Sequence, residues 1–179
     1  MNLRIPGPTP LPPETIEAIG RQMINHRGPQ FEVMFQEITE WAAALLETEK
    51  DLYVLTTSGT GGMEAAICNT LSPGDKVLCV SIGVFGDRFQ TIADAYGAQV
   101  RALRYQMGEP AHADEVGEIV RSEGPFVAVT VTQNETSTGV TNDMEAICKA
   151  IRGAADPSPL ILVDGISGAP AIRLRTDAW

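Results

Sequence analysis

Positive charge is scarce in this sequence. It contains 13 lysine and arginine residues against 23 aspartate and glutamate residues, which gives a formal net charge of −10 at pH 7. Non-specific nucleic-acid binding depends on basic surfaces, so we expect no nucleic-acid partner. The apolar runs also fall short of the roughly 20 residues that a membrane-spanning helix needs, so we expect no membrane association.

Cysteine is scarce as well. Cys68, Cys79 and Cys148 are far apart and form no C-x-x-C pair, so neither a zinc site nor a disulfide framework is indicated. The first residues, MNLRIPGPTPLPP, lack the apolar core of a secretory signal peptide. We therefore expect a cytoplasmic protein without a metal site, in which the three thiols are free and buried.

The hydrophobic residues that are present form two kinds of pattern. Helical stripes come first, at residues 15–23 and 31–47, and short apolar runs then alternate with helical stretches. The expected strands are 52–55, 77–80, 100–103, 126–131 and 160–163, and the expected helices between them are 63–71, 85–96, 113–123 and 143–154. Strands that begin roughly 25–35 residues apart are typical of βαβ units. We predict an α/β fold with a mainly parallel (mixed) sheet sandwiched by helices.

Ligands of such sheets bind beyond the carboxyl ends of the strands, so the segments after the strands are the candidate sites. The first is VLTTSGTGG, where free N–H groups at a helix start and the hydroxyls of Ser58 and Thr60 favour an anion such as phosphate. This loop matches neither the Walker A pattern, the dinucleotide-binding pattern nor the G-x-S-x-G elbow of hydrolases. A purely structural glycine turn would look similar, so the loop alone leaves the question open.

The other strand ends carry residues with more than one interpretation. Phe85, in GVFGDRF, is either a core aromatic residue or a ring exposed for stacking. Asn134 and Thr136, in NETSTG, are either turn residues or hydrogen-bond donors to a ligand. Asp164 follows a buried strand and needs a partner, which is the next turn, a cation or a protonated ring nitrogen. Together these segments specify a phosphate, a flat ring, a polar ring substituent and a basic ring nitrogen, which describes pyridoxal 5′-phosphate.

The same segments resemble the class V aminotransferases, a family of fold-type I pyridoxal-phosphate enzymes. The resemblance is carried in order by PGPTPLPPETIEAI, SGTGGMEAA, GVFGDRF, NETSTGV, and VDGISG with LRTDAW, over essentially the whole chain. It is strongest to the alanine–glyoxylate and serine–glyoxylate aminotransferases. It implies transfer of an amino group from a small amino acid, alanine or serine, to a 2-oxo acid such as glyoxylate. It also implies a homodimer for the full-length enzyme.

The resemblance gives roles to the residues around the cofactor. Ser58, Gly59 and Thr60 match the loop that holds the cofactor phosphate. Phe85 matches the aromatic residue stacked on the pyridine ring, and Ile166 matches the apolar residue on the other face of the ring.

Further roles concern the polar atoms of the ring and the substrate. Thr136 matches the hydroxyl residue near the phenolic oxygen of the ring, a role that Asn134 could share. Asp164 matches the carboxylate paired with the pyridine nitrogen, whose pKa such an anion raises. Gly7 matches the Pro-Gly-Pro segment that approaches the substrate.

The resemblance also divides the chain. Residues 1–48 correspond to an N-terminal helical segment, and residues 49–179 to the first part of the cofactor-binding large domain. The remainder of that domain, a C-terminal small domain and the Schiff-base lysine are expected downstream of RTDAW, because Lys50, Lys76 and Lys149 follow no strand end in the required order. We therefore expect the chain to correspond to the N-terminal half of such an enzyme.

Two alternatives stay open at this point. A pyridoxal-phosphate-dependent lyase such as a cysteine desulfurase would share the phosphate loop and Asp164, but it needs a histidine where Phe85 stands. A catalytically inactive fragment that only binds a ligand or dimerises is the other alternative. Coding sequence downstream of residue 179 with a Ser-x-Lys-like segment would favour the enzyme, and a stop codon would favour the fragment.

We expect residues 1–179 alone to form no covalent bond between a lysine and pyridoxal phosphate. Borohydride reduction of the purified chain with the cofactor, followed by peptide mass spectrometry, checks this expectation. An adduct trapped on one specific lysine, together with transaminase activity, would show it to be wrong.

Overall fold

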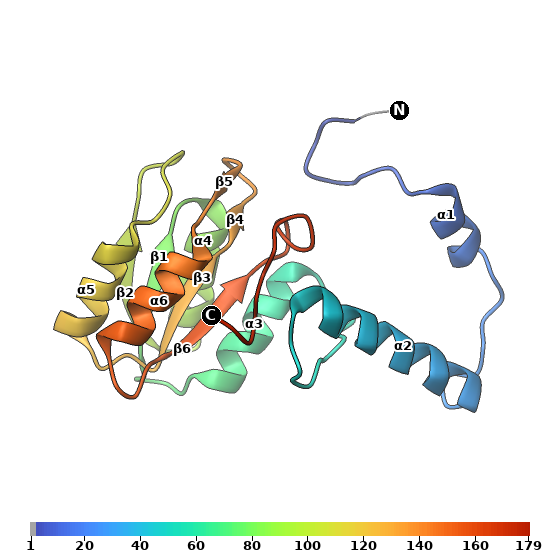
Figure 1. Cartoon of the computed structure of the whole chain (residues 1–179), viewed down its shortest axis with the longest axis horizontal. Coiled ribbons are helices and arrows are strands. Elements are labelled where there is room, and N and C mark those ends of the chain that lie inside the picture. The colour runs from blue at the N-terminus through green and yellow to red at the C-terminus, as the bar shows by residue number, and fades with distance from the viewer. Residues whose placement is uncertain (1–2) are drawn as a thin grey trace. The chain divides into compact units, whose positions relative to one another are not determined.

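The computed structural model describes residues 3–179, which form two compact units. The first unit ends at Val54 and contains two helices, α1 (Pro13–Ile19) and α2 (Pro29–Leu46) (Figure 1). Both helices begin at a proline, whose fixed φ suits the first helical turn, so each starts two residues before the predicted position. The first helix also ends earlier than predicted, because Gly20 forms its C-cap.

The predicted strand at residues 52–55 is wrong. No strand among residues 3–179 pairs with this run. Tyr53, Val54 and Leu55 are 81%, 56% and 52% exposed. A strand needs a neighbour to take its backbone hydrogen bonds, so the apolar pattern by itself does not make one.

The second unit, Leu55–Trp179, is built on a four-stranded parallel sheet with the order β2–β1–β3–β6. Its strands are β1 (Lys76–Ser81), β2 (Gln99–Arg104), β3 (Ala128–Thr132) and β6 (Leu160–Asp164). A short antiparallel ladder of β4 (Asn134–Glu135) and β5 (Val140–Thr141) follows β3. The helices are α3 (Gly59–Thr70), α4 (Val84–Ala95), α5 (Ala113–Glu123) and α6 (Met144–Ala154). The predicted α/β class with a parallel sheet is confirmed.

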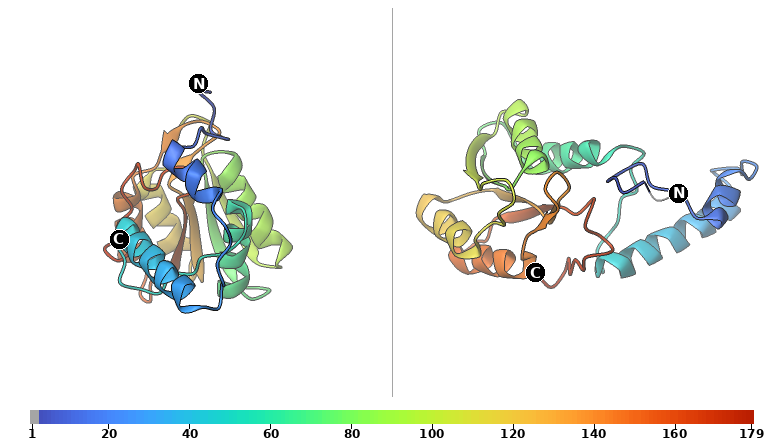
Figure 2. Two further views of the ribbon diagram at one scale, coloured as in Figure 1. Left: turned by 90° about the vertical axis from the view of Figure 1, so that its right-hand side faces the viewer. Right: turned by 90° about the horizontal axis from the view of Figure 1, so that it is seen from above.

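Helices cover both faces of this sheet (Figure 2). The alternation along β1 shows why: Val77 and Cys79 pack in a cluster with residues of α3 and α4. Leu78 and Val80 point to the opposite face and pack in a cluster with residues of α5 and α6. Because both faces of β1 are buried, its central residues 77–80 are all apolar instead of alternating with polar residues.

The three thiols are free, as expected, but only two of them are buried. Cys79 lies in β1 and Cys148 in α6, and both are buried. Cys68 is exposed, because Met63 and Ile67 form the buried face of α3 and Cys68 lies off that face. Among the described residues, no helix has the length and apolarity that crossing a membrane requires.

Gly86 offers a test of how closely α4 packs on β1. A Cβ atom at Gly86 would lie 2.7 Å from Ser81 Cα, so Gly86→Ala should push the helix from the strand and cost about 1–3 kcal/mol of unfolding free energy. Gly153, in α6, has no atom within 4 Å of such a Cβ, so Gly153→Ala should instead stabilise by about 0.5–1 kcal/mol. Urea unfolding of both variants checks the opposite signs, and a shift in the same direction would contradict this packing.

Candidate functional site

The carboxyl ends of three neighbouring strands meet at one edge of the sheet. β3 lies between β1 and β6. In the register of the sheet Val80 pairs with Val131, and Thr132 pairs with Asp164. The segments that follow these strands therefore leave the sheet side by side. They carry four of the predicted site residues, Phe85, Asn134, Thr136 and Ile166, and Asp164 is the last residue of β6.

The start of α3 has the features of an anion site. The backbone N–H groups of Gly59 and Thr60 donate no hydrogen bond to any residue in the range 3–179, while Ser58 Oγ accepts one from Gly61 N at 3.4 Å. The turn depends on a glycine, because a Cβ at Gly61 would stand 2.0 Å from Thr57 Oγ1. Two unused donors, exposed hydroxyl groups and the helix dipole favour a bound anion.

Arg88 connects this loop to Phe85. Its Nη1 atom donates to Thr60 Oγ1 at 2.9 Å, and its Cζ atom lies 4.8 Å from the centroid of the Phe85 ring. The half-buried Phe85 ring therefore has a cation beside it and stays close to the glycine loop. The sequence patterns did not single out Arg88, although residues three apart on a helix share a face and GVFGDRF places Arg88 in that relation to Phe85.

Glu135 is a second residue that the sequence patterns did not single out. It is fully buried, and four donors converge on its carboxylate. Oε2 accepts from the N–H groups of Phe85 at 3.0 Å and Gly86 at 3.4 Å, and Oε1 accepts from Ser137 N at 3.1 Å and Oγ at 2.7 Å. The sequence does contain a signal for Glu135, because a carboxylate three residues after a buried apolar strand is expected to need partners.

Asp164 ends β6 and has one oxygen without a partner. It is 9% exposed, Oδ1 accepts from Ile166 N at 3.0 Å, and the buried Oδ2 accepts no hydrogen bond from residues 3–179. Burial raises the pKa of this carboxyl above its ordinary value, and the negative charge of Glu135 acts in the same direction. The Ile166 N–H and the charge of Arg88 lower the pKa, but they do not cancel the effect of burial.

Asn134 uses its side chain to hold the candidate site together. Its Nδ2 atom donates to Ser167 Oγ at 2.9 Å, and its Oδ1 atom accepts from Thr141 Oγ1 at 2.9 Å. Ser167 Oγ in turn donates to Asn134 O at 2.8 Å. The segment after β6 is thus fastened to the short ladder after β3. Thr136 is half-buried in the turn of that ladder, between β4 and β5.

Ile166 is the last of the predicted site residues of the second unit. Ile166 is 64% exposed and lies against the glycine loop, where a Cβ at Gly59 would be 3.2 Å from Ile166 Cγ1. The structure therefore brings the residues of the second unit together around one edge of the sheet. Gly7 is in the first unit and has open space around it.

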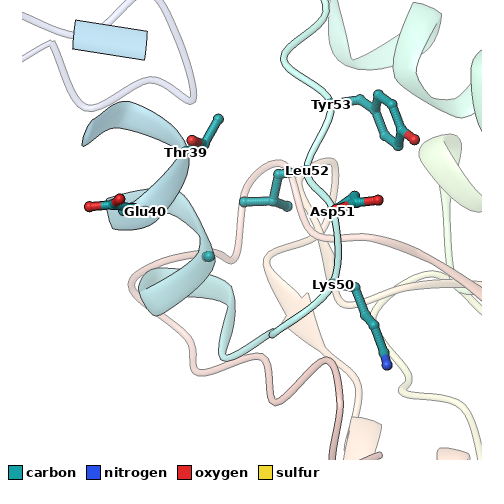
Figure 3. A pocket seen from close by; sticks show the side chains of 7 residues that line it. Thr39, Glu40, Lys50, Asp51, Leu52 and Tyr53 are labelled. Atoms are coloured by element: carbon teal, nitrogen blue, oxygen red, sulfur yellow. The ribbon is translucent and has the colours of Figure 1, made fainter. Parts of the chain in front are cut away.

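Two of the three lysines lie away from this edge. Lys76 begins β1, at the amino end of the strand, where its Nζ donates to Glu123 O and lies 4.8 Å from the centroid of the Phe126 ring. Lys149 is exposed on α6. Lys50 belongs to the first unit and lines an open hollow beside α2, into which Leu52 points while Lys50 turns away (Figure 3). None of the predicted site residues lines this hollow.

The chain is similar in sequence to one protein family and to several curated proteins. The family model described as aminotransferase class V matches residues 2–179. The L-aspartate–glyoxylate aminotransferase of Paracoccus denitrificans is 38% identical over 178 residues, which cover 98% of this chain and 45% of the relative. A protein named soluble hydrogenase, small subunit, of Synechococcus sp. is 37% identical over 179 residues, 99% of this chain and 46% of the relative.

A solved structure is similar to the same extent. The crystal structure of alanine–glyoxylate aminotransferase from Nostoc sp. superposes with a TM-score of 0.90 at 30% identity, covering 98% of this chain and 46% of that chain. The chain therefore spans about half the length of the relatives that it matches.

The raised pKa of Asp164 predicts how Asp164→Asn changes the stability of the protein without any ligand. A folded-state pKa above the unfolded-state value of about 3.9 means that the wild type loses stability as pH rises through the folded-state pKa. The asparagine variant keeps an oxygen for the Ile166 N–H and avoids burying a charge. Its melting temperature should therefore match that of the wild type near pH 3 and exceed it at pH 7.

Thermal melts of both proteins from pH 3 to pH 8 check this prediction. Asp156→Asn, at an exposed position, is the control for the loss of one carboxylate. A wild type that gains stability over the asparagine variant as pH rises would contradict the raised pKa.

Proposed function

The chain belongs to the class V aminotransferases, and from this premise we propose that it forms the cofactor-binding part of a pyridoxal-phosphate-dependent enzyme that aminates glyoxylate. The donor in this proposal is a small amino acid, alanine or serine. Glyoxylate is the proposed acceptor because it appears in the names of the Paracoccus and Nostoc relatives. Alanine is a proposed donor because it appears in the name of the Nostoc relative. Serine is a proposed donor because the sequence motifs resemble those of the serine–glyoxylate aminotransferases.

The main support for this proposal is that the buried Oδ2 atom of Asp164 accepts no hydrogen bond within residues 3–179. Such an acceptor is costly unless a donor from outside the chain completes it. The protonated ring nitrogen of pyridoxal phosphate is a donor of this kind, and Asp164 would hold the proton there. Bound pyridoxal phosphate supplies an electron-accepting ring that stabilises negative charge at the substrate carbon when its proton leaves.

The other residues of the edge suit the rest of the cofactor. The unused N–H groups of Gly59 and Thr60 and the hydroxyl of Ser58 would bind the phosphate. Arg88 adds positive charge beside this loop, in a protein whose net charge is −10. Phe85 would stack on the ring and fix its orientation.

The remaining predicted contacts concern the other ring face, the ring oxygen and the substrate. Ile166, exposed beside the glycine loop, would cover the second face and exclude water from it. Thr136 would donate to the phenolic oxygen, and Asn134 could share that role through the second proton of Nδ2. Gly7 as a substrate contact, the lysine expected downstream and the homodimer stay predictions.

The proposal follows the aminotransferase relatives and not the hydrogenase name of the Synechococcus relative, because the family model that matches residues 2–179 is that of the class V aminotransferases.

The test uses the protein as its gene encodes it, loaded with pyridoxal phosphate. Alanine, serine and aspartate are screened as donors with glyoxylate and pyruvate as acceptors, and release of sulfide from cysteine is measured in parallel to detect a desulfurase. Asp164→Ala should retain cofactor binding but lower kcat by at least about 100-fold, because the ring nitrogen loses its anionic partner.

Asp156→Asn, which is exposed, is the matched control and should leave kcat unchanged. Normal turnover in Asp164→Ala would refute the role given to Asp164. Sulfide release without transamination would replace the proposed function by the lyase alternative.

A further inference from the structure

Glu135 is not part of α4, but its carboxylate lies at the start of this helix. The first N–H groups of a helix have no partner within it, and Gly83, the N-cap residue of α4, provides no side-chain cap. Glu135 Oε2 accepts from the N–H groups of Phe85 and Gly86, and Ser137 Oγ accepts from Val84 N at 3.4 Å. The cap of α4 is thus supplied by the segment that follows β3.

The approach of this carboxylate depends on the glycine before the helix. A Cβ at Gly83 would stand 2.6 Å from Glu135 Cγ and 2.8 Å from Ser137 Oγ. Any side chain at that position would push Glu135 out of the helix start. The contact between the two segments is therefore close and specific.

The backbone of Glu135 is itself firmly held. Its carbonyl oxygen accepts from Thr138 N at 3.2 Å and Gly139 N at 2.7 Å, and the residue pairs with Val140 in the short antiparallel ladder. The carboxylate thus projects from a fixed turn, and the same ladder carries Asn134. A movement of the ladder would move the start of α4 with it.

The start of α4 carries the two side chains that connect to the glycine loop. Phe85 donates its backbone N–H to Glu135, and Arg88 lies one turn further, over the Phe85 ring and hydrogen-bonded to Thr60. A continuous series of contacts thus runs from the ladder after β3, through Glu135 and α4, to the loop at the start of α3.

We propose that Glu135 is a positioning residue for the cofactor: it fixes the Phe85 ring relative to the glycine loop and to the segment after β3. This role rests on the proposed function, since it requires a flat ring to be stacked on Phe85. Glu135 itself touches neither the cofactor nor the substrate, because both of its oxygens are filled by donors of the chain.

The test compares Glu135→Gln with the wild type in the protein as its gene encodes it. The substitution turns one acceptor oxygen into an N–H donor that faces other donors. In the ligand-free protein, hydrogen exchange of the Phe85 and Gly86 amides should become at least about tenfold faster. In titrations with pyridoxal phosphate, the affinity should fall by about tenfold. The visible circular dichroism of the bound cofactor, which reports a fixed ring orientation, should weaken.

Asp143→Ala is the control for a purely structural effect, because it removes a helix cap elsewhere in the second unit. Asp143 also caps a helix with its carboxylate, since Oδ1 accepts from Ala146 N at 3.0 Å at the start of α6. This substitution should lower the melting temperature without changing the exchange of the Phe85 amide, the cofactor affinity or the dichroism. Glu135→Asp, which keeps the carboxylate, should restore part of the lost affinity and dichroism.

The outcomes separate this inference from the proposed function. Unchanged exchange at Phe85 and Gly86 in Glu135→Gln overturns the inference, as does faster exchange with unchanged cofactor affinity and dichroism. If the wild type itself binds no pyridoxal phosphate, the proposed function fails and the positioning role fails with it. If Glu135→Gln does not fold, Ser137→Ala removes one donor to Oε1 and should shift the same three measurements by smaller amounts; no shift overturns the inference.

Discussion

The parallel pairing of β1, β3 and β6 is the constraint on which the candidate site depends. Parallel strands end at the same edge of their sheet, and the register that pairs Thr132 with Asp164 sets how far each strand extends. The segments after these strands meet there, and α3 contributes its first turn to the same group of residues through contacts with Arg88 and Ile166. Backbone pairing alone therefore brings residues that are far apart in the sequence close together in space.

Two buried carboxylates at this edge differ in how many hydrogen bonds they accept from the protein. Glu135 has donors on both oxygens, so its burial is compensated within the protein. Asp164 has a donor on Oδ1 and none among the described residues on Oδ2. The contrast gives the two carboxylates separate roles: Glu135 organises the start of α4, and Asp164 is left with an acceptor that a ligand can use.

Several parts of this arrangement could be predicted from the sequence. The strands β1, β2, β3 and β6 and the helices α3 to α6 follow from apolar runs and periodicity, because burial on one or both faces dictates these patterns. Asp164 could be singled out because a carboxylate at the end of a buried strand is unusual. The prediction of a strand at residues 52–55 was wrong, because an apolar pattern does not indicate whether a neighbouring strand is present to pair with it.

Arg88 and Glu135 could not be assigned in the same way. Their partners come from other elements: Glu135 is 50 residues from Phe85 in the sequence, and Arg88 is 28 residues from Thr60. A strand end considered by itself shows which side chains are polar but not which donors face them. The role of Asn134 is hidden for the same reason, since its partner Ser167 lies beyond β6.

The role proposed for Asp164 depends on a proton between its carboxylate and the nitrogen of the cofactor ring, and this proton can be observed directly. Pyridoxal phosphate labelled with ¹⁵N in the ring is bound to the protein as its gene encodes it, and the nitrogen chemical shift is measured in the wild type and in Asp164→Asn. We expect the shift of a protonated ring nitrogen in the wild type and of an unprotonated one in the variant. An unprotonated nitrogen in the wild type, or the same shift in both proteins, would contradict this role.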